Sequence, residues 1–185
     1  MIQPEFFKKI TDTYSVANRN AITDTTLLQT SRDFEETIGH KITAINPEAI
    51  ATRFSTDASV LITTKYDGQG IHIYFEASDN PAPHKPEIFA YHPYSGRAYT
   101  GLPSLLNLAT QLKQKGVKKA LLRAELYIPG EPNAKRPNNA DIARVAFNGT
   151  PSEINSMSLA IIRILMLDGQ NWITKPIIEN FEKMG

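Results

Sequence analysis

Cysteine is absent from the chain, which has 185 residues. Without a thiol the protein has no disulfide framework, no thiolate metal site and no cysteine nucleophile, and its composition fits a reducing compartment. Charge of one sign is scarce as well, because 20 lysines and arginines stand against 19 aspartates and glutamates and leave a formal net charge of +1. A strongly basic nucleic-acid coat is therefore excluded for the surface as a whole, although a local basic face is not.

Long apolar runs are also missing. The longest apolar cluster, residues 159–167, is interrupted by Arg163 and is far shorter than the roughly 20 residues that a membrane helix needs. The first residues lack the basic stretch and apolar run of a secretory signal, so we expect a cytoplasmic protein with no membrane partner. Hydrophobic residues make up 41% and charged residues 21% of the chain, which predicts one folded domain over residues 1–185.

Hydrophobic periodicity predicts where the helices lie. Apolar residues between Phe6 and Tyr14 follow helical spacing, and they predict that residues 1–57 form a largely helical segment packed on the domain. Gly116 is placed to end a helix whose apolar face runs from Leu105 to Leu112. The predicted helices are residues 4–16, a helix that begins near residue 30, and residues 47–54, 103–115, 140–147 and 175–184.

Runs of β-branched and apolar residues predict the strands. Residues 58–64 and 71–75 flank a short connection that contains glycine, and this arrangement predicts a hairpin. The other predicted strands are residues 87–91, 120–128 and 159–167, the last of them buried. Strands from distant parts of the chain, mixed with single helices, predict an α+β fold rather than a regular series of βαβ units.

One group of residues has the features of a reactive site. Lys65, Asp67 and Gly68 lie at the end of a predicted strand, and Glu125 lies within a later strand. A lysine amine is a nucleophile only when neutral, so its ordinary pKa near 10.4 must be lowered by desolvation or by neighbouring cations. Gly68 lets the backbone turn and a ligand approach closely. The Glu125 carboxylate supplies an acceptor for a ribose hydroxyl or a metal-bound water.

These residues carry a resemblance to a known family. Residues 65–68, Lys-Tyr-Asp-Gly, resemble the nucleophile motif Lys-x-Asp-Gly of the covalent nucleotidyltransferases, which are the ATP-dependent DNA ligases, the RNA ligases and the mRNA capping enzymes. Residues 124–126 are similar to their third motif, a strand that carries a glutamate, here Glu125. Residues 95–97, Ser-Gly-Arg, are similar to the serine/arginine motif of DNA ligases, and residues 164–169 resemble the strand and Asp-Gly turn that follow. The resemblance spans residues 58–180.

The resemblance implies a nucleotidyltransferase (ATP-grasp-like) domain with largely antiparallel sheets and flanking helices. It also implies three chemical steps. Lys65 attacks the α-phosphate of ATP and forms lysyl-AMP, AMP passes to the 5′-phosphate of nicked DNA, and a 3′-hydroxyl displaces it. Mg²⁺ and basic side chains stabilise the phosphoryl charge in each step. By the same resemblance Asp67 and Gly68 bind the nucleotide, Glu125 contacts its ribose or Mg²⁺, directly or through water, and Arg97 grips a nucleic-acid phosphate.

The chain departs from the family pattern at several positions. Gly70 replaces an arginine, Thr63 replaces an adenine-contacting glutamate, and Ile162 stands where an aromatic residue often stacks on the base. The metal-binding and lysine-pair motifs expected after residues 168–169 are not found. We therefore expect the front portion of an adenylation domain, incomplete at its C-terminus and a weak catalyst by itself, with the missing strands or an OB-type domain in the full-length protein.

Other interpretations stay open. The departures at Thr63 and Gly70 keep an RNA ligase or a guanylyl-transferring capping enzyme as alternatives, and RNA as a substrate. The missing motifs favour a non-catalytic remnant that only binds nucleotide or nucleic acid. A basic cluster between residues 113 and 119 could attract a phosphate backbone or simply be a solvated helix end. The four histidines show no metal-ligand spacing, and His72 is predicted to be structural or exposed.

Overall fold

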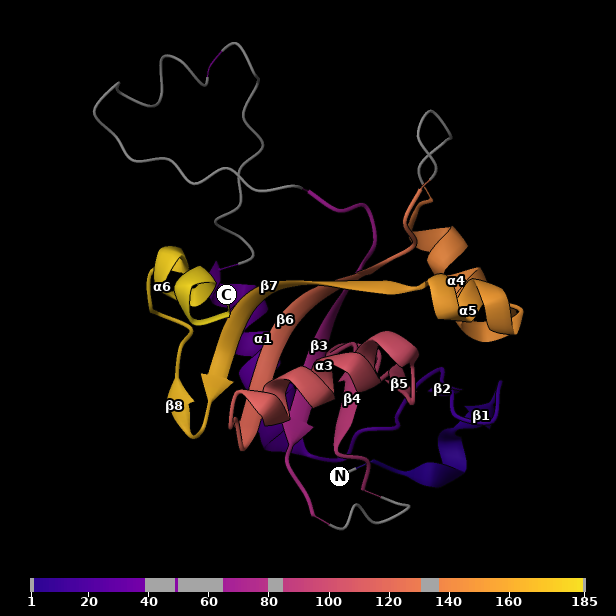
Figure 1. The fold of residues 1–185 in the computed structure, drawn as a ribbon, viewed down its shortest axis with the longest axis horizontal. Helices are drawn as coiled ribbons and strands as arrows, with labels where there is room; N and C mark the ends of the chain where they lie inside the picture. The colour runs from indigo at the N-terminus through magenta and orange to yellow at the C-terminus, as the bar shows by residue number, and fades with distance from the viewer. Residues whose placement is uncertain (1, 39–48, 50–64, 80–84, 131–136, 185) are drawn as a thin grey trace.

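An antiparallel sheet forms the centre of the fold, and the helices lie around it (Figure 1). The computed structural model describes residues 2–38, 49, 65–79, 85–130 and 137–184. Within these residues the strands follow the order β1-β2-β5-β4-β3-β6-β7-β8, and each pair of neighbours is antiparallel. The strands are β1 (Lys8–Lys9), β2 (Ser15–Ala17), β3 (Gln69–Glu76), β4 (Ile88–Tyr91), β5 (Ala98–Thr100), β6 (Lys119–Tyr127), β7 (Ser158–Leu167) and β8 (Gln170–Asn171).

Helices flank this sheet, and local signals fix where they begin. Asn138 caps α4 by accepting hydrogen bonds from the amides of residues 140 and 141, and Thr150 caps α5 in the same way at residue 153. Both are reciprocal capping boxes, which satisfy amide groups that the first helical turn leaves unpaired. The helices are η1 (Pro4–Phe6, a 3-10 helix), α1 (Thr25–Ile38), α3 (Pro103–Gln114), α4 (Asn139–Asn148), α5 (Pro151–Ser156) and α6 (Ile177–Met184).

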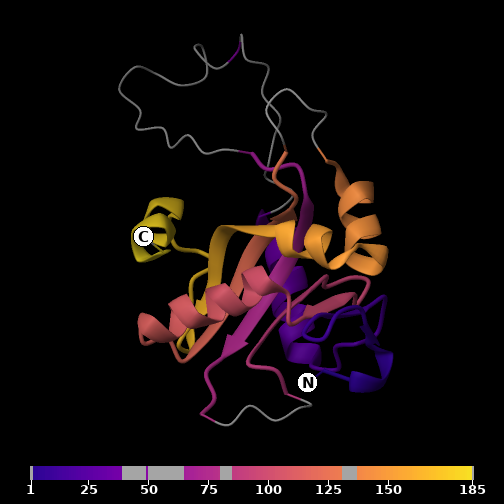
Figure 2. The same cartoon turned by 45° about the vertical axis from the view of Figure 1, so that its right-hand side comes forward.

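The two faces of the sheet bury separate apolar clusters. Along β3, Ile71 and Ile73 pack in the cluster that contains Leu105 of α3. The side chains that alternate with Ile71 and Ile73 point to the opposite face of the sheet, toward α1, whose Phe34 belongs to the second cluster. Figures 1 and 2 show α3 and α1 on opposite sides of the sheet. Because β3 is covered on both faces and paired on both edges, the structure gives the residues near its start a rigid support.

The coarse prediction of the fold is confirmed. The structure is a mixture of helices and strands with a large antiparallel sheet and flanking helices. The predicted helices at 103–115, 140–147 and 175–184 correspond to α3, α4 and α6, and the predicted strands at 87–91 and 120–128 correspond to β4 and β6. The strand at 159–167 is present as β7, but it is only partly buried, and Ile162 is 41% exposed.

The predicted N-terminal helix over residues 4–16 is wrong. After the short η1 the chain forms β1 and β2, so this segment contributes strands to the sheet. A polar turn explains the difference, because the Thr11 hydroxyl accepts a hydrogen bond from the Tyr14 amide at 3.0 Å, and the Tyr14 carbonyl accepts from the Ile10 amide at 3.0 Å. Tyr14 is buried by contact with α4, where its hydroxyl donates to the Ala146 carbonyl at 2.9 Å, and not by a helical face.

Three further predictions need correction or fall wholly or partly outside the described residues. The helix expected near residue 30 begins earlier, at Thr25, because the Asp24 carboxylate accepts from the Leu27 amide at 2.9 Å and caps it. The hairpin predicted for 58–64 and 71–75 has its first strand outside the described residues, and of the helix predicted at 47–54 only residue 49 is described, which is helical. The second strand is β3, and its neighbours are β4 and β6.

Among the described residues no helix combines the length and apolar character of a membrane span.

The Asn180 side chain connects α6 to β7 by a hydrogen bond, and its substitution tests the packing of α6 on the sheet. The side chain is fully buried, accepts a hydrogen bond from the Ile164 amide at 2.7 Å and donates one to the Pro176 carbonyl at 3.2 Å. Asn180→Ala would leave a buried amide unpaired, so we expect it to lower the free energy of unfolding by about 1–3 kcal/mol. Urea denaturation measures this loss. The exposed Asn155 gives the control, since Asn155→Ala should change stability by no more than about 0.5 kcal/mol.

Candidate nucleotide site at the start of β3

Antiparallel pairing of β3 and β6 brings the predicted site residues together. Gly70 lies opposite Glu125 in the register, so the residues just before β3 run along the end of β6. The Gly68 amide donates a hydrogen bond to the Glu125 carboxylate at 3.1 Å across 57 positions of sequence. Gly68 thus contacts Glu125, and Lys65 and Asp67 lie near enough for their charges to act on the Glu125 carboxyl.

The close approach at Gly68 depends on the absence of a side chain. A Cβ atom at this position would lie 2.3 Å from the Leu126 carbonyl oxygen and 2.9 Å from Cγ of Glu125. Neither distance is a possible contact, and the first involves backbone. Glycine is therefore needed here for contact with β6, in addition to the turn expected from the sequence.

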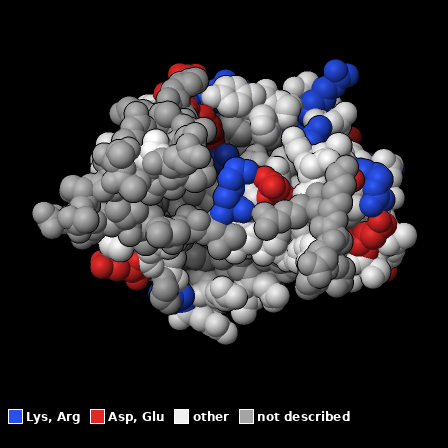
Figure 3. Space-filling model, turned by 90° about the horizontal axis from the view of Figure 1, so that it is seen from above, with Lys and Arg blue, Asp and Glu red and all other residues white. Residues whose placement is uncertain are grey.

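Lys65 lies at the surface of the site. Its Nζ donates to the Asp67 carboxylate at 2.6 Å, and the two side chains are 85% and 50% exposed. Tyr66, between them, packs against Tyr127 of β6 with ring centroids 4.5 Å apart, which anchors the segment to the sheet. The end of the sheet where β3 begins is at the top of Figure 1, and Figure 3 shows basic and acidic side chains next to each other near the middle of that face.

Glu125 has a different environment from Lys65, because its side chain is only 17% exposed. Burial raises the pKa of the Glu125 carboxyl, while the positive charges of Arg123 and Lys65 and the hydrogen bond from Gly68 act against this rise. The negative charge of Asp67 adds to it. A half-buried carboxylate held by one amide and facing cations has free oxygen lone pairs for a ribose hydroxyl or a metal-bound water.

Two charged residues that were not predicted from the sequence, Arg123 and Glu35, form an ion pair next to Glu125. Arg123 lies two positions earlier on β6 and so on the same face of the sheet, with Nη1 4.0 Å from a Glu125 oxygen. Its Nε donates to Glu35 of α1 at 2.5 Å. The alternation of a strand could have identified Arg123. Glu35 could not be found in this way, because 88 positions separate it from its partner.

His72 lies beside Glu35 on the same face of the sheet. It is 1% exposed and its Nε2 is 3.5 Å from the Glu35 carboxylate, yet neither ring nitrogen has a hydrogen-bond partner among the described residues. Burial, together with the positive charge of Arg123 and then of His92, lowers the pKa of His72 from 6.5 to about 3. The ring is therefore neutral at physiological pH and is structural, which is one of the two roles predicted for it.

Arg97 lies apart from this group. Its guanidinium sits over the Phe147 ring of α4, 5.1 Å from the centroid, and its neighbour Tyr99 belongs to the α3 cluster. The Tyr99 hydroxyl donates to the Gln69 side chain at 2.6 Å, so this polar group touches β3 from the face opposite Glu125. The contact between Arg97 and a nucleic-acid phosphate stays a prediction. Thr63 lies outside the described residues.

A metal would need additional oxygen ligands at this site. No group of three or more histidine, aspartate or glutamate side chains that could hold a metal ion occurs among the described residues. Mg²⁺ is commonly held by one or two carboxylates together with substrate phosphates and water. Glu125 fits that limited role, and it does not by itself form a closed metal site.

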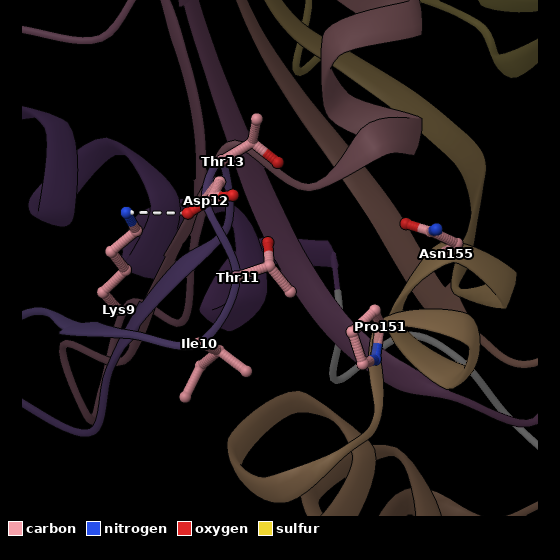
Figure 4. A pocket seen from close by; sticks show the side chains of 7 residues that line it. All are labelled: Lys9, Ile10, Thr11, Asp12, Thr13, Pro151 and Asn155. Carbon is pink, nitrogen blue, oxygen red and sulfur yellow. Dashed lines mark ion pairs between the residues drawn. The ribbon is translucent and has the colours of Figure 1, made fainter.

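A separate hollow lies beside the β1–β2 edge of the sheet. It has a volume of about 600 Å³ and is bordered by the turn between β1 and β2 and by α5 (Figure 4). Lys9 and Asp12 form an exposed ion pair of 3.1 Å at its rim. None of the predicted site residues lines this hollow.

A scan against protein-family models finds no match, and a search of curated proteins finds no relative. The resemblance to the nucleotidyltransferases therefore rests on the sequence motifs and stays a prediction.

Gly68→Ala tests the contact between the two strands. The added methyl group would force the Leu126 carbonyl or the start of β3 to move, and such overpacking lowers the free energy of unfolding by about 1–3 kcal/mol. Gly130→Ala is the control, because its nearest neighbour would be Pro137 Cδ at an ordinary 3.6 Å, and we expect a change within about 1 kcal/mol. Equal stability losses in chemical denaturation would contradict the assigned contact.

The buried His72 predicts a pH dependence of folding. Because its pKa falls from 6.5 to about 3 on folding, the unfolded chain binds the proton more tightly. Stability contributed by neutral His72 is therefore present above pH 6.5 and is lost as the pH falls toward 3, with a slope of up to about 1.4 kcal/mol per pH unit. His72→Gln should flatten the curve of unfolding free energy against pH in this window. Parallel curves of unfolding free energy against pH for the wild-type protein and His72→Gln would contradict this role of His72 in the pH dependence.

Proposed function

We propose that this chain carries the nucleotide-accepting lysine of an ATP-dependent DNA ligase-type nucleotidyltransferase. The observation that carries the proposal is the hydrogen bond of 3.1 Å between Gly68 of the Lys-x-Asp-Gly segment and Glu125. Two segments that are far apart in the sequence, the one that precedes β3 and strand β6, meet through this hydrogen bond, and this contact supports the proposal. The nucleotidyltransferase fold itself is part of the proposal and is compatible with the antiparallel sheet.

In the proposed reaction, Lys65 Nζ attacks the α-phosphorus of ATP. A phosphorus–nitrogen bond forms, the bond to the pyrophosphate oxygen breaks, and pyrophosphate leaves with the electron pair. The ammonium must first lose a proton, and the Asp67 carboxylate, 2.6 Å from Nζ, is placed to receive it. Glu125 orients the ribose or holds a water on Mg²⁺, whose charge stabilises the departing pyrophosphate. Nicked DNA then takes the AMP, and Arg97 is the proposed phosphate contact.

A second candidate is a binding module of the same fold that forms no covalent adduct. It is favoured by the surroundings of Lys65, whose side chain is 85% exposed, because a lysine nucleophile needs desolvation or neighbouring cations to activate it. RNA ligase or capping-type chemistry remains a variant of the first proposal, with RNA or GTP in place of DNA or ATP.

Incubation with α-labelled ATP and Mg²⁺, followed by denaturing gel and peptide mapping, tests the covalent proposal. We expect weak labelling near pH 7, because Lys65 is exposed and ion-paired, and an increase approaching tenfold per pH unit as the amine loses its proton. Lys65→Arg should abolish the label, since a guanidinium stays protonated and is no nucleophile. Lys9→Arg alters a comparable exposed ion pair with Asp12 and should leave the label unchanged.

The outcomes separate the candidates. Label that persists in Lys65→Arg would refute the proposed nucleophile. Binding of ATP, measured by calorimetry, with no adduct at any pH would favour the binding module. A stronger adduct from GTP than from ATP would favour the capping-type variant, and transfer of the label to nicked RNA rather than nicked DNA would favour an RNA ligase.

A further inference from the structure

Two tyrosine rings lie against each other on the Glu125 face of the sheet. Tyr66, in the segment before β3, and Tyr127, on β6, have ring centroids 4.5 Å apart and ring planes tilted by 38°. Tyr127 follows Glu125 by two positions on β6, so strand alternation places both side chains on the same face. The contact with Tyr127 brings the Tyr66 ring to that face as well. We call the two rings the tyrosine pair.

The two rings are held in different ways. Tyr127 belongs to β6, pairs with Ser158 of β7 in the register, and is partly buried. Tyr66 is 39% exposed, although it packs on Tyr127. The strand therefore fixes Tyr127, Tyr127 supports Tyr66, and part of the Tyr66 ring remains open to a ligand among the described residues.

An exposed aromatic ring that rests on a second ring is a suitable surface for another planar ring. Aromatic rings favour offset or tilted packing with centroids roughly 4.5–7 Å apart. Nucleobases stack on tyrosine regardless of their identity, because every base has a π-face. Side chains two positions apart on a strand are about 6–7 Å apart. A small ligand that contacts Glu125 through a hydroxyl group can therefore also reach the tyrosine pair with a planar ring.

We propose that the tyrosine pair is the base-stacking surface of the nucleotide site, in which Tyr66 contacts the base and Tyr127 is the positioning residue behind it. This inference rests on the proposed function, because Glu125 then contacts the ribose of the same nucleotide. Stacking recognises a flat ring and not the hydrogen-bonding edge of a base. The tyrosine pair therefore accepts ATP and GTP alike, and any choice between them comes from other residues.

Calorimetric binding of ATP, GTP and inorganic tripolyphosphate with Mg²⁺ tests this surface, with a single-stranded DNA oligomer as a fourth ligand. Tyr66→Leu keeps an apolar side chain but removes the ring, so it should weaken binding of both nucleotides by roughly fivefold or more. Tripolyphosphate has no base, and its interaction with the protein should not change. Tyr66→Phe retains the ring and should retain nucleotide affinity within about twofold.

NMR of the tyrosine ring protons gives a direct second measurement. Addition of ATP should shift the ring signals of Tyr66, because a stacked base changes the magnetic surroundings of the ring. Addition of tripolyphosphate should leave these signals in place. Tyr127→Leu should reduce both the ATP-dependent shift of Tyr66 and the affinity for ATP, because Tyr66 then lacks the ring that supports it.

Tyr74→Leu is the matched control. Tyr74 lies on β3 four positions after Gly70, which is opposite Glu125 in the register, so it is on the same face of the sheet but toward the other end of the strand. Its ring also packs on an aromatic partner, Phe89, with centroids 5.4 Å apart and a tilt of 37°. We expect Tyr74→Leu to leave the affinity for ATP unchanged.

The outcomes separate this inference from the proposed function. If the wild-type chain binds no nucleotide, the proposed function fails and the stacking surface fails with it. If the wild-type chain binds ATP and Tyr66→Leu binds it equally well, the proposed function stands and the stacking surface is overturned. Equal losses in Tyr74→Leu, or an equal loss for tripolyphosphate in Tyr66→Leu, would also overturn it. If Tyr66→Leu weakens only the DNA oligomer, the rings stack on bases of a strand, and their role in nucleotide recognition is overturned.

Discussion

The antiparallel pairing of β3 with β6 is the constraint on which the rest of the site depends. Eight residues of β3 are in register with eight of β6, and apolar clusters cover both faces of the pair. The backbone of Gly68 can therefore approach β6 closely enough to donate to Glu125. A loop that carried the same residues without this support would not hold them at a fixed distance. The charge network is a consequence of the register, because the register places Arg123 over Gly70 and Glu125 opposite it.

Strand alternation divides the polar residues near this end of the sheet between its two faces. Glu125 and Arg123 face α1, where Glu35 and the neutral His72 meet them. Gln69 faces the other way and receives the Tyr99 hydroxyl, close to Arg97 and the Phe147 ring. A ligand that contacted both Glu125 on one face and Arg97 on the other would have to extend around the end of the sheet, where Lys65 and Asp67 lie. The two polar groups therefore lie on opposite faces of the sheet, and Gln69 and Tyr99 are buried.

Sequence patterns predicted the parts of this structure that depend on neighbouring residues. The helix α3, with its apolar stripe and the glycine that follows it, and the strand β6 were predictable for this reason. The N-terminal helix was predicted wrongly because Tyr14 is buried by α4, through a hydrogen bond to Ala146 that spans 132 positions. The site likewise combines features set by neighbouring residues with features set by distant ones. The Lys-x-Asp-Gly segment and Glu125 could be recognised locally, whereas the partnership of Glu35 with Arg123 arises only when α1 packs on the sheet.

The two central groups of the site are prepared to different degrees. Glu125 is held before any ligand arrives, because the Gly68 amide donates to its carboxylate and its side chain is only 17% exposed. Lys65 is not, since its amine is solvated and paired with Asp67. If the proposed function holds, this organisation of the carboxylate would lower the cost of binding a nucleotide, while the proposed chemical step needs a neutral amine. Desolvation of Lys65 by a bound nucleotide would favour that neutral form. Binding of the nucleotide at Glu125 would then make Lys65 reactive. Lys65 would therefore react with a bound nucleotide and not with phosphates in free solution.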